Sequence, residues 1–454
     1  MWGRRSIGWV VLGTVLISAP GCQWQRVGSD TEPDPSVVVP QLFDPTALYT
    51  RMGFLASGPP VPYVATLGYF GSDRPDTTLA LFGLSMANDA LGFRLAGEVF
   101  EARYTVEVSV RRQGTVLARM SSEERVRVAS REEARRADES IIFQELLRLV
   151  PGTYDIVVVV RDELSGAVGR VERNVTIPRF SSAGLVPPVP VYRVAGRARR
   201  SDPPPILLNP RATVPFGLDT LHLYLEAYGA APEAPARFTL IGPTGDVVLE
   251  RAVPVTGDAS LAWAAVAFGP DELPVGELRV RASVDGLADT VDLRALVSFS
   301  EQWAITNFEE ILTLLRFFGQ DRAIAEMHAA PPAERSDLWR TFWRATDPNP
   351  LTPQNEALEL YFHRVEEANQ RFREAGEPGW SSERGEVFIT LGEPDEIFDQ
   401  SSDLQGALRI IRWNYLGERL TVDFVDETGF GRFRLTPASR ADYQRVLNMV
   451  RSRG

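Results

Sequence analysis

The most informative stretch of the chain is a corner followed by a β-branched run, Leu149-Val150-Pro151-Gly152-Thr153-Tyr154-Asp155-Ile156-Val157-Val158-Val159-Val160. An unbroken run of Val and Ile predicts a central strand that is buried on both faces. Working outward, residues 104–110 alternate polar and apolar side chains with a period of two, which is typical of a half-buried strand. These patterns predict an antiparallel β-sandwich over residues 54–180.

The corner phrase has a shorter counterpart farther along, Leu273-Pro274-Val275-Gly276-Glu277-Leu278. The first phrase resembles the corner before a late strand in immunoglobulin-like sandwiches, where a Tyr hydroxyl ties the turn. Its recurrence predicts a second antiparallel sandwich over residues 188–299, after a stiff linker, Pro187-Pro188-Val189-Pro190. Because the repeated phrase is short, a single larger β domain is the alternative.

After Ser300 the hydrophobic period changes from that of strands to that of helices. Helices are predicted near residues 308–318 and 338–343 and over about 353–375, the last with Thr352 as N-cap and Pro353 in its first turn. Strands are then predicted at 386–391, 409–415, 420–424 and 431–435, before a terminal helix from about Ser439. Residues 301–454 are therefore predicted to form an α+β domain with a small antiparallel sheet.

Composition excludes several classes of function. The 454 residues leave room for about three domains. All 48 basic residues are Arg, so neither a lysine Schiff base nor a Walker-type phosphate loop is possible within this sequence. The net charge of -12 argues against nucleic acid as a partner. Three scattered His and one Cys give no metal-ligand spacing, so no metal and no cofactor are expected.

The N-terminus predicts export and a lipid anchor. Residues 1–21 have a basic start, a short apolar run and small residues before Cys22, as in a secretory signal. Cys22 stands where a lipobox places the residue to be acylated, and an ordinary signal peptide with a chance cysteine is the alternative. Gln23 favours the outer membrane, because an Asp there resembles the inner-membrane retention signal. The protein is expected to face the periplasm, with the cell surface as the alternative. Residues 22–53 are predicted to be a disordered, Pro-rich tether.

One segment of the C-terminal domain carries a family resemblance: Pro378-Gly379-Trp380-Ser381-Ser382-Glu383-Arg384-Gly385-Glu386-Val387-Phe388-Ile389. With Phe342-Trp343 upstream, then Gly392-Glu393-Pro394-Asp395 and Trp413 downstream, it resembles the GWxTD family of bacterial exported proteins. The resemblance implies a recognisable fold and an exported location, but no reaction, cofactor or substrate. Where the family name places Thr-Asp, this chain has Ser382-Glu383, which keeps the hydroxyl and the carboxylate and favours a capping or turn role.

The polar residues of this segment allow two interpretations. Glu383 and Asp395 with Arg384 could form a general acid/base pair beside an anion-gripping arginine. The favoured interpretation is local architecture, in which Gly385 allows a close backbone approach and Pro394-Asp395-Glu396 opens a helical turn. Buried amides need partners, so Asn369, on the buried side of the long helix, is expected to hold the Trp380 loop.

Aromatic residues in the same domain also have two interpretations. Trp380 could anchor a partner, although filling a gap between helix and sheet is favoured. A carbohydrate platform or, preferably, a helix-packing core could be formed by Trp339, Phe342, Trp343, Tyr361 and Phe362.

The sequence therefore predicts a lipid-anchored envelope protein without enzymatic activity. Its β modules would act as spacers and its C-terminal domain would hold another envelope protein. An enzyme that processes envelope glycan or peptide, and a module that binds carbohydrate or peptide, are the alternatives.

Overall fold

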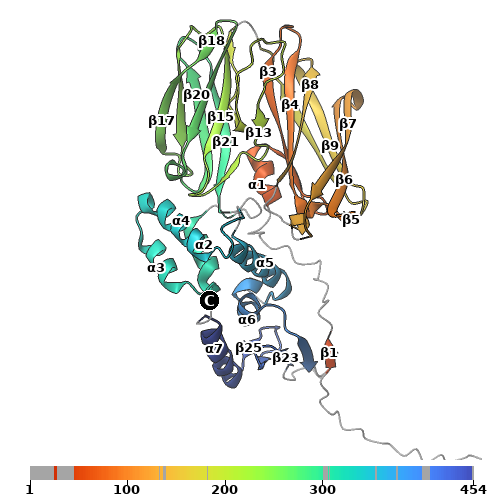
Figure 1. Ribbon diagram of the computed structural model, residues 1–454, viewed down its shortest axis with the longest axis vertical. Coiled ribbons are helices and arrows are strands. Elements are labelled where there is room, and N and C mark those ends of the chain that lie inside the picture. The colour runs from red at the N-terminus through yellow and green to blue at the C-terminus, as the bar shows by residue number, and fades with distance from the viewer. Residues whose placement is uncertain are drawn as a thin grey trace, which may run out of the picture. The chain divides into compact units, whose positions relative to one another are not determined.

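The computed structural model of the protein describes residues 25–27, 45–131, 133–135, 140–180, 183–299, 305, 307–352, 355–374, 377–400 and 409–451 (Figure 1). The predicted signal peptide and Cys22 lie outside the described residues. The chain divides into two compact units, one of residues 38–359 and one of residues 1–37 with 360–454. No helix among the described residues is both long and apolar enough to span a membrane.

The end of the predicted tether is a helix, which corrects the expectation of disorder there. Helix α1 spans Pro45–Met52 and buries Leu48, Tyr49 and Met52. Pro45 opens the helix, a position at which its missing N–H costs nothing. The Tyr49 hydroxyl lies 2.8 Å from that of Thr213. The helix has only three buried apolar residues and follows a Pro-rich stretch, so its pattern in the sequence is weak.

Two antiparallel sheets form the first sandwich. One has the order β2-β3-β4-β8, and the other has the order β10-β9-β6-β5 with β7 also paired to β6. The strands are β2 Leu55–Ser57, β3 Tyr63–Gly71, β4 Thr78–Ala87, β5 Arg94–Ala96, β6 Val99–Arg112, β7 Thr115–Val128, β8 Ser140–Leu149, β9 Gly152–Asp162 and β10 Val168–Ile177. The predicted alternation is confirmed in β6, because Tyr104, Val106 and Val108 are buried in the core between the sheets.

The β-branched run is the interior strand that the sequence predicts. Strand β9 lies between β10 and β6, and Ile156, Val158 and Val160 have no exposed surface. The corner before it is tied by its tyrosine: the Tyr154 hydroxyl donates to the backbone oxygen of Val150 at 2.9 Å. This contact fixes where the chain turns into β9, as in the corner of an immunoglobulin-like sandwich.

The second sandwich also has two sheets, with the orders β13-β12-β15-β19-β18 and β14-β21-β20-β16-β17, and β11 pairs with β15. All described pairings are antiparallel except β14 with β21. The strands are β11 Gly184–Leu185, β12 Val189–Arg193, β13 Leu207–Leu208, β14 Thr213–Pro215, β15 Leu221–Tyr228, β16 Pro235–Ile241, β17 Val247–Pro254, β18 Thr256–Asp258, β19 Leu261–Phe268, β20 Gly276–Val284 and β21 Thr290–Ser298. The predicted linker is in part strand, because Val189 and Pro190 pair with Tyr224 and Leu223.

A shared core and a buried ion pair join the two sandwiches. Phe70 and Leu81 of the first sandwich cluster with Leu208 and Tyr224 of the second. Beside this cluster, Arg197 and Glu226 have side chains that are 1% and 0% exposed, with a shortest N–O distance of 2.7 Å.

Hydrogen bonds to neighbouring groups surround this ion pair. The Glu226 carboxylate accepts from Arg197 through both oxygens, and also from the hydroxyls of Tyr224 at 2.9 Å and Tyr228 at 2.7 Å. Arg197 donates further to the backbone oxygen of Gly71 at 2.7 Å, in the first sandwich. Two segments distant in sequence are thus fixed to each other by charge-assisted hydrogen bonds in a dry environment.

Three helices follow the second sandwich and confirm the predicted change of period. They are α2 Phe308–Leu314, α3 Asp321–Ala329 and α4 Arg335–Thr346. Asn307 caps α2, since its side chain accepts from the backbone N–H of Glu309 and of Glu310. Trp339 of α4 packs on Phe299 with 4.7 Å between ring centroids. Arg340 of α4 donates to the backbone oxygen of Gly217 at 2.9 Å, which ties this helix to the second sandwich.

The long helix α5 spans Glu356–Arg371, and its start differs from the prediction. The N-cap is Asn355, whose side-chain oxygen accepts from the backbone N–H of Leu358 at 3.0 Å. Thr352, the predicted cap, instead donates to the backbone oxygen of Asn349 at 2.8 Å. Pro353 lies outside the described residues. Asn caps as well as Thr does, so the sequence offered two starts three residues apart.

The C-terminal sheet has the order β1-β22-β23-β24-β25 and is antiparallel throughout. Its strands are β1 Gln25–Val27, β22 Glu396–Gln400, β23 Arg409–Tyr415, β24 Leu420–Asp426 and β25 Arg434–Leu435, and the helices of the same unit are α6 Glu383–Leu391 and α7 Pro437–Arg451. The predicted fold class, two antiparallel immunoglobulin-like sandwiches and then helices with a small sheet, is confirmed.

Two predicted elements of this unit are wrong. Residues 386–391 form the second part of α6 and not a strand. A short β-branched and aromatic run fits a buried helix equally well, and the Ser382 cap ahead of it decides for the helix. The predicted helical turn at Pro394-Asp395-Glu396 is also absent, since Glu396 already begins β22. Gly392, at φ +85°, ends α6 and turns the chain directly into that strand.

Candidate functional site

The segment that carries the family resemblance is a tight loop between α5 and α6. Its 3-10 turn, η6, spans Gly379–Ser381. A Cβ at Gly379 would overlap the backbone oxygen of Ala368, and a Cβ at Gly385 would overlap the backbone oxygen of Gly379. Both glycines therefore allow backbones to approach more closely than any side chain permits, which is the role predicted for Gly385.

Ser382 caps α6, in keeping with the predicted capping role. Its hydroxyl has no exposed surface, donates to the backbone oxygen of Gly379 at 2.7 Å and accepts from the backbone N–H of Gly385 at 3.0 Å. A threonine hydroxyl could make the same two bonds. This explains in physical terms why Ser can replace the Thr of the family name here.

Trp380 and Asn369 are both buried, at 7% and 6% exposure. Trp380 therefore belongs to the core and is no exposed anchor. The Asn369 side chain makes no hydrogen bond to the Trp380 loop among the described residues, and its Oδ1 accepts none. The predicted tie is therefore wrong. The loop meets α5 through close backbone contact at Gly379 instead.

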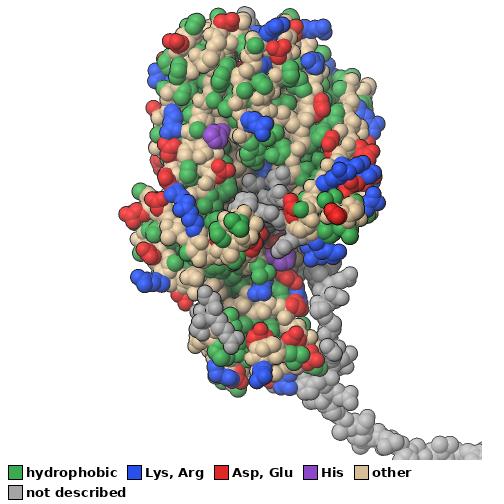
Figure 2. Space-filling model, viewed as in Figure 1, with side chains coloured by type: hydrophobic (Ala, Val, Ile, Leu, Met, Phe, Trp, Pro, Cys, Tyr) green, Lys and Arg blue, Asp and Glu red, His purple; other side chains and the backbone are tan. Residues whose placement is uncertain are grey.

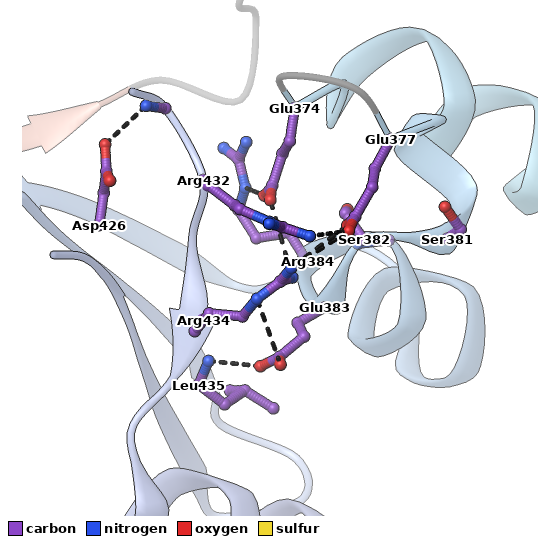
Figure 3. Close-up of polar contacts among 12 residues, drawn as sticks. Glu374, Glu377, Ser381, Ser382, Glu383, Arg384, Asp426, Arg432, Arg434 and Leu435 are labelled. Atoms are coloured by element: carbon purple, nitrogen blue, oxygen red, sulfur yellow. Dashed lines mark hydrogen bonds and ion pairs between the residues drawn. The ribbon is translucent and has the colours of Figure 1, made fainter. Parts of the chain in front are cut away.

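Glu383 is engaged in binding the chain that precedes α7. One carboxylate oxygen accepts from the backbone N–H of Leu435 at 2.6 Å (Figure 3). The other lies 2.5 Å from the Arg440 guanidinium. Because a backbone amide and a cation occupy this carboxylate, Glu383 acts as a clamp between the start of α6 and β25.

Arg384 points the other way, into a buried pair with Glu374. Its Nε lies 3.3 Å from the Glu374 carboxylate, whose side chain has no exposed surface. The guanidinium also stacks 4.3 Å from the centroid of the Phe433 ring. Burial raises the pKa of Glu374, an effect that the charge of Arg384 only partly opposes, and burial likewise lowers the pKa of Arg384.

Glu377 completes what we call the Glu–Arg network: Glu374, Glu377, Glu383, Arg384, Arg432, Arg434 and Arg440. Glu377 forms an ion pair with Arg432 and lies 3.3 Å from Arg434. Burial would raise the pKa of Glu377, but hydrogen bonds from both arginines outweigh it and lower the pKa. Figure 3 shows that the acids come from the α5–α6 region, that Arg432 lies just before β25 and that Arg434 begins this strand. The network therefore fastens these two segments together.

The carboxylates of the enzymatic hypothesis do not converge. Glu383 begins α6, whereas Asp395 follows its end. The nine residues of α6 separate them by roughly 13 Å along the helix axis. Asp395 accepts from the backbone N–H of Leu416 at 2.6 Å, in the turn between β23 and β24. Each carboxylate is held by a backbone amide, so the two do not form an acid/base pair.

The aromatic residues proposed as a platform are largely core. Trp339 and Phe342 stack at 5.6 Å, and Tyr361 and Phe362 meet edge to face at 5.4 Å. All four are buried, and Trp343 is half-buried. Rings enclosed in this way have no open face on which a sugar could stack.

An exposed aromatic residue that the sequence reasoning missed lies in the turn after β24. Phe430 is 80% exposed. The fully buried carboxylate of Asp426 accepts from the backbone N–H groups of Thr428 at 3.1 Å, Gly429 at 2.9 Å and Gly431 at 2.7 Å. We call residues 426–431 the Phe430 loop. Its signal in the sequence is an Asp followed by two glycines that flank an aromatic residue, a pattern of Asx turns.

The backbone hydrogen bonds of the Phe430 loop stabilise the charged form of Asp426. Burial would raise the pKa of its carboxyl group, but the hydrogen bonds from Gly431, Thr428 and Gly429 outweigh that effect and lower the pKa. The loop backbone is therefore held in one conformation by a charged group at neutral pH. On the face seen in Figure 2, acidic, basic and hydrophobic side chains are interspersed, with no large field of one sign.

Comparison with known families gives one match. The family model of the GWxTD domain matches residues 288–424, from within β21 to within β24. The chain therefore contains a GWxTD domain. No curated protein matches the chain.

Several solved structures resemble parts of the chain at low identity. A biofilm-associated protein domain is 8% identical over 56% of this chain, with a TM-score of 0.16, and a tetra-tandem repeat from a large adhesion protein is 14% identical over 52%, with a TM-score of 0.18. The match spans 54% and 50% of those chains. Fibronectin(III)-like modules from Clostridium thermocellum are 12% identical over 51% of this chain and 93% of theirs, with a TM-score of 0.14.

Proposed function

We propose that this protein is lipid-anchored in the cell envelope and holds another envelope protein through its C-terminal domain, without being an enzyme. One observation carries the proposal. The Phe430 loop exposes 80% of an aromatic side chain on a backbone that Asp426 already fixes. A large apolar side chain held rigidly in water is a feature of protein-binding surfaces.

The energetics favour Phe430 as an anchor. Burial of a phenylalanine side chain in a partner's pocket contributes about 1.5–3 kcal/mol. Association also costs the ordering of loops at the interface, but three backbone hydrogen bonds to Asp426 already order this loop. Most of the gain from burial is therefore available for binding, which places Phe430 near the ~2 kcal/mol level of a hot spot.

Other functions have less support. An enzyme would need Glu383 and Asp395 to meet, and each is occupied at a different end of α6. A carbohydrate platform would need exposed rings, whereas Trp339 and Tyr361 are 1% and 6% exposed. Insertion of Phe430 into a membrane is disfavoured because a net charge of -12 is repelled by anionic lipid surfaces.

The anchor at Cys22 is part of the proposal and rests on the N-terminal sequence. Cells fed an alkyne fatty acid should label the intact protein, which should fractionate with the outer membrane. Cys22→Ala should lose the label, and the protein should leave the membrane fraction because two or more acyl chains are needed for firm anchoring. If Cys22→Ala remained in the membrane fraction to the same extent, a lipid anchor would not be what holds the protein there.

Capture from solubilised membranes tests the proposed interaction. The intact protein is compared with Phe430→Ala and with Leu416→Ala as a matched control. Leu416 is 63% exposed and lies in the turn at the opposite end of β24. A lost contribution of about 2 kcal/mol predicts roughly 30-fold weaker binding of the captured envelope protein by Phe430→Ala, with little change for Leu416→Ala.

Two outcomes would overturn the proposal. Equal capture by all three proteins would show that the Phe430 loop holds no partner. The second outcome concerns flotation with phosphatidylglycerol–phosphatidylethanolamine vesicles. If the intact protein and Leu416→Ala floated with the vesicles and Phe430→Ala did not, the loop would be a membrane contact. Thermal unfolding of each variant controls for misfolding, since an exposed side chain is expected to change stability by no more than about 0.5 kcal/mol.

A further inference from the structure

A cavity of about 370 Å³ opens at one end of the first sandwich, where Figure 1 labels β5. Two short 3-10 turns border it, η1 Asn88–Ala90 and η2 Glu133–Arg135. The apolar part of its wall includes Leu91, Phe93 and Phe100. This volume falls within the range of small-molecule sites, which combine an apolar wall with a few charged groups.

The charged part of the wall is mainly basic. Arg94, Arg131 and Arg135 line the cavity together with one acid, Asp89. The Arg131 guanidinium lies 5.8 Å from the centroid of the Phe100 ring, so the charge is held above the apolar wall. Among the described residues, no carboxylate lies within ion-pairing distance of these three arginines.

Other arginines of the same sandwich do form ion pairs with carboxylates. Arg103 and Arg127 share the carboxylate of Glu101, at 3.0 and 3.1 Å. Arg119 pairs with Glu107 at 2.7 Å. The sandwich therefore neutralises many of its arginines locally, whereas the arginines around the cavity pair with no carboxylate of the part of the chain that the structure describes. Guanidinium groups present a planar set of N–H donors that matches a carboxylate or a phosphate.

We propose that this cavity binds a small amphiphile with an anionic head group and an apolar body. The head group, a carboxylate or a phosphate, would take the donors of Arg94, Arg131 and Arg135. The apolar body would pack against Phe93 and Phe100, which removes its surface from water. The proposal is independent of the Phe430 loop, which belongs to the other compact unit.

Equilibrium dialysis of the full chain tests the proposal with three ten-carbon probes: decanoate, decyl phosphate and decanol. Saturable binding of one of the two anions, with decanol bound at least tenfold more weakly, is expected, because only the anions engage the guanidinium groups. The better-bound anion identifies the head group. If neither anion bound saturably, or if decanol bound as well as the anions, the proposal would be wrong.

Two variants locate the binding. Arg131→Gln should weaken binding of the preferred anion by about tenfold or more, because one charge-assisted contact is lost. Arg148→Gln is the matched control, since Arg148 is an exposed arginine of β8 in the same sandwich that does not line the cavity. Equal binding by both variants would place the anion elsewhere and overturn the assignment. Leu95→Asp, at a lining position that is 65% exposed, offers a second test that folding should tolerate, and it should also weaken binding.

Discussion

Replacement of Glu226 by alanine should destabilise the protein much more than the loss of an exposed ion pair does. The change removes the carboxylate that Arg197 contacts through two nitrogens, at 2.8 and 2.7 Å. It also removes the acceptor for the hydroxyls of Tyr224 and Tyr228. A guanidinium that is 1% exposed would then remain in the core without its counter-charge.

The magnitude follows from this geometry. Breaking a buried pair by removal of one partner costs about 3–5 kcal/mol, since the remaining charge stays desolvated. In the compact unit of residues 38–359, that loss corresponds to a fall in Tm of roughly 4–8 °C. Calorimetry or urea unfolding followed by circular dichroism would measure it. Because water and salt do not reach the pair, the loss should be nearly the same at low and high ionic strength.

Two further variants make the reasoning refutable. Asp285→Ala breaks the exposed pair with Arg237, whose side chains are 57% and 47% exposed, and should cost no more than about 1 kcal/mol. The double variant Arg197→Met, Glu226→Leu should be less destabilised than Glu226→Ala, because no buried charge is left unpaired. If Glu226→Ala cost no more than Asp285→Ala, the buried pair would not be what fixes the two sandwiches to each other.

Three other predictions concern the GWxTD segment. Gly385→Ala should destabilise the C-terminal unit by about 2 kcal/mol or more in urea unfolding, because its Cβ would overlap a backbone oxygen; Gly417→Ala, with nothing within 4 Å, is the control and should be nearly neutral. Ser382→Ala should cost about 1 kcal/mol whereas Ser382→Thr should cost much less, and equal losses would contradict the capping role. Burial raises the pKa of Glu374 above its ordinary 4.5, so the folded state binds this proton more tightly than the unfolded chain. Its contribution to stability should be fully present below about pH 4.5 and be lost as pH rises through the raised pKa; unfolding from pH 4 to 8 should show that slope, and Glu374→Gln should flatten it.

Elements whose pattern is local were predictable from the sequence. The run that became β9, the period-two alternation of β6 and the tyrosine corner at Tyr154 all depend on neighbours within a few residues. Helix α6 shows where this reasoning fails. Its apolar run satisfies the rules for a strand, and the choice depends on a single hydroxyl, that of Ser382, which satisfies an N–H at the helix start.

The candidate site was predictable in its residues but not in its contacts. The sequence identified Ser382, Glu383 and Arg384, yet gave no indication that Glu383 clamps Leu435 or that Arg384 turns towards Glu374. Such pairings join segments that only the tertiary fold brings together. For the same reason, the sequence did not predict the ion pair of Arg197 with Glu226, which lies on another part of the chain.

The pairing of β1 with β22 has a consequence for the order in which the protein folds. Val27 pairs with Ile397, roughly 370 residues later, so this contact closes one of the longest loops in the chain and forms slowly. Because β1 is synthesised long before β22, it stays without its partner strand until that later part of the chain has been made. The sandwiches, whose strands pair mostly with near neighbours in sequence, can complete their folding during that interval. We therefore expect the addition of β1 at the edge of the C-terminal sheet to be one of the last steps of folding.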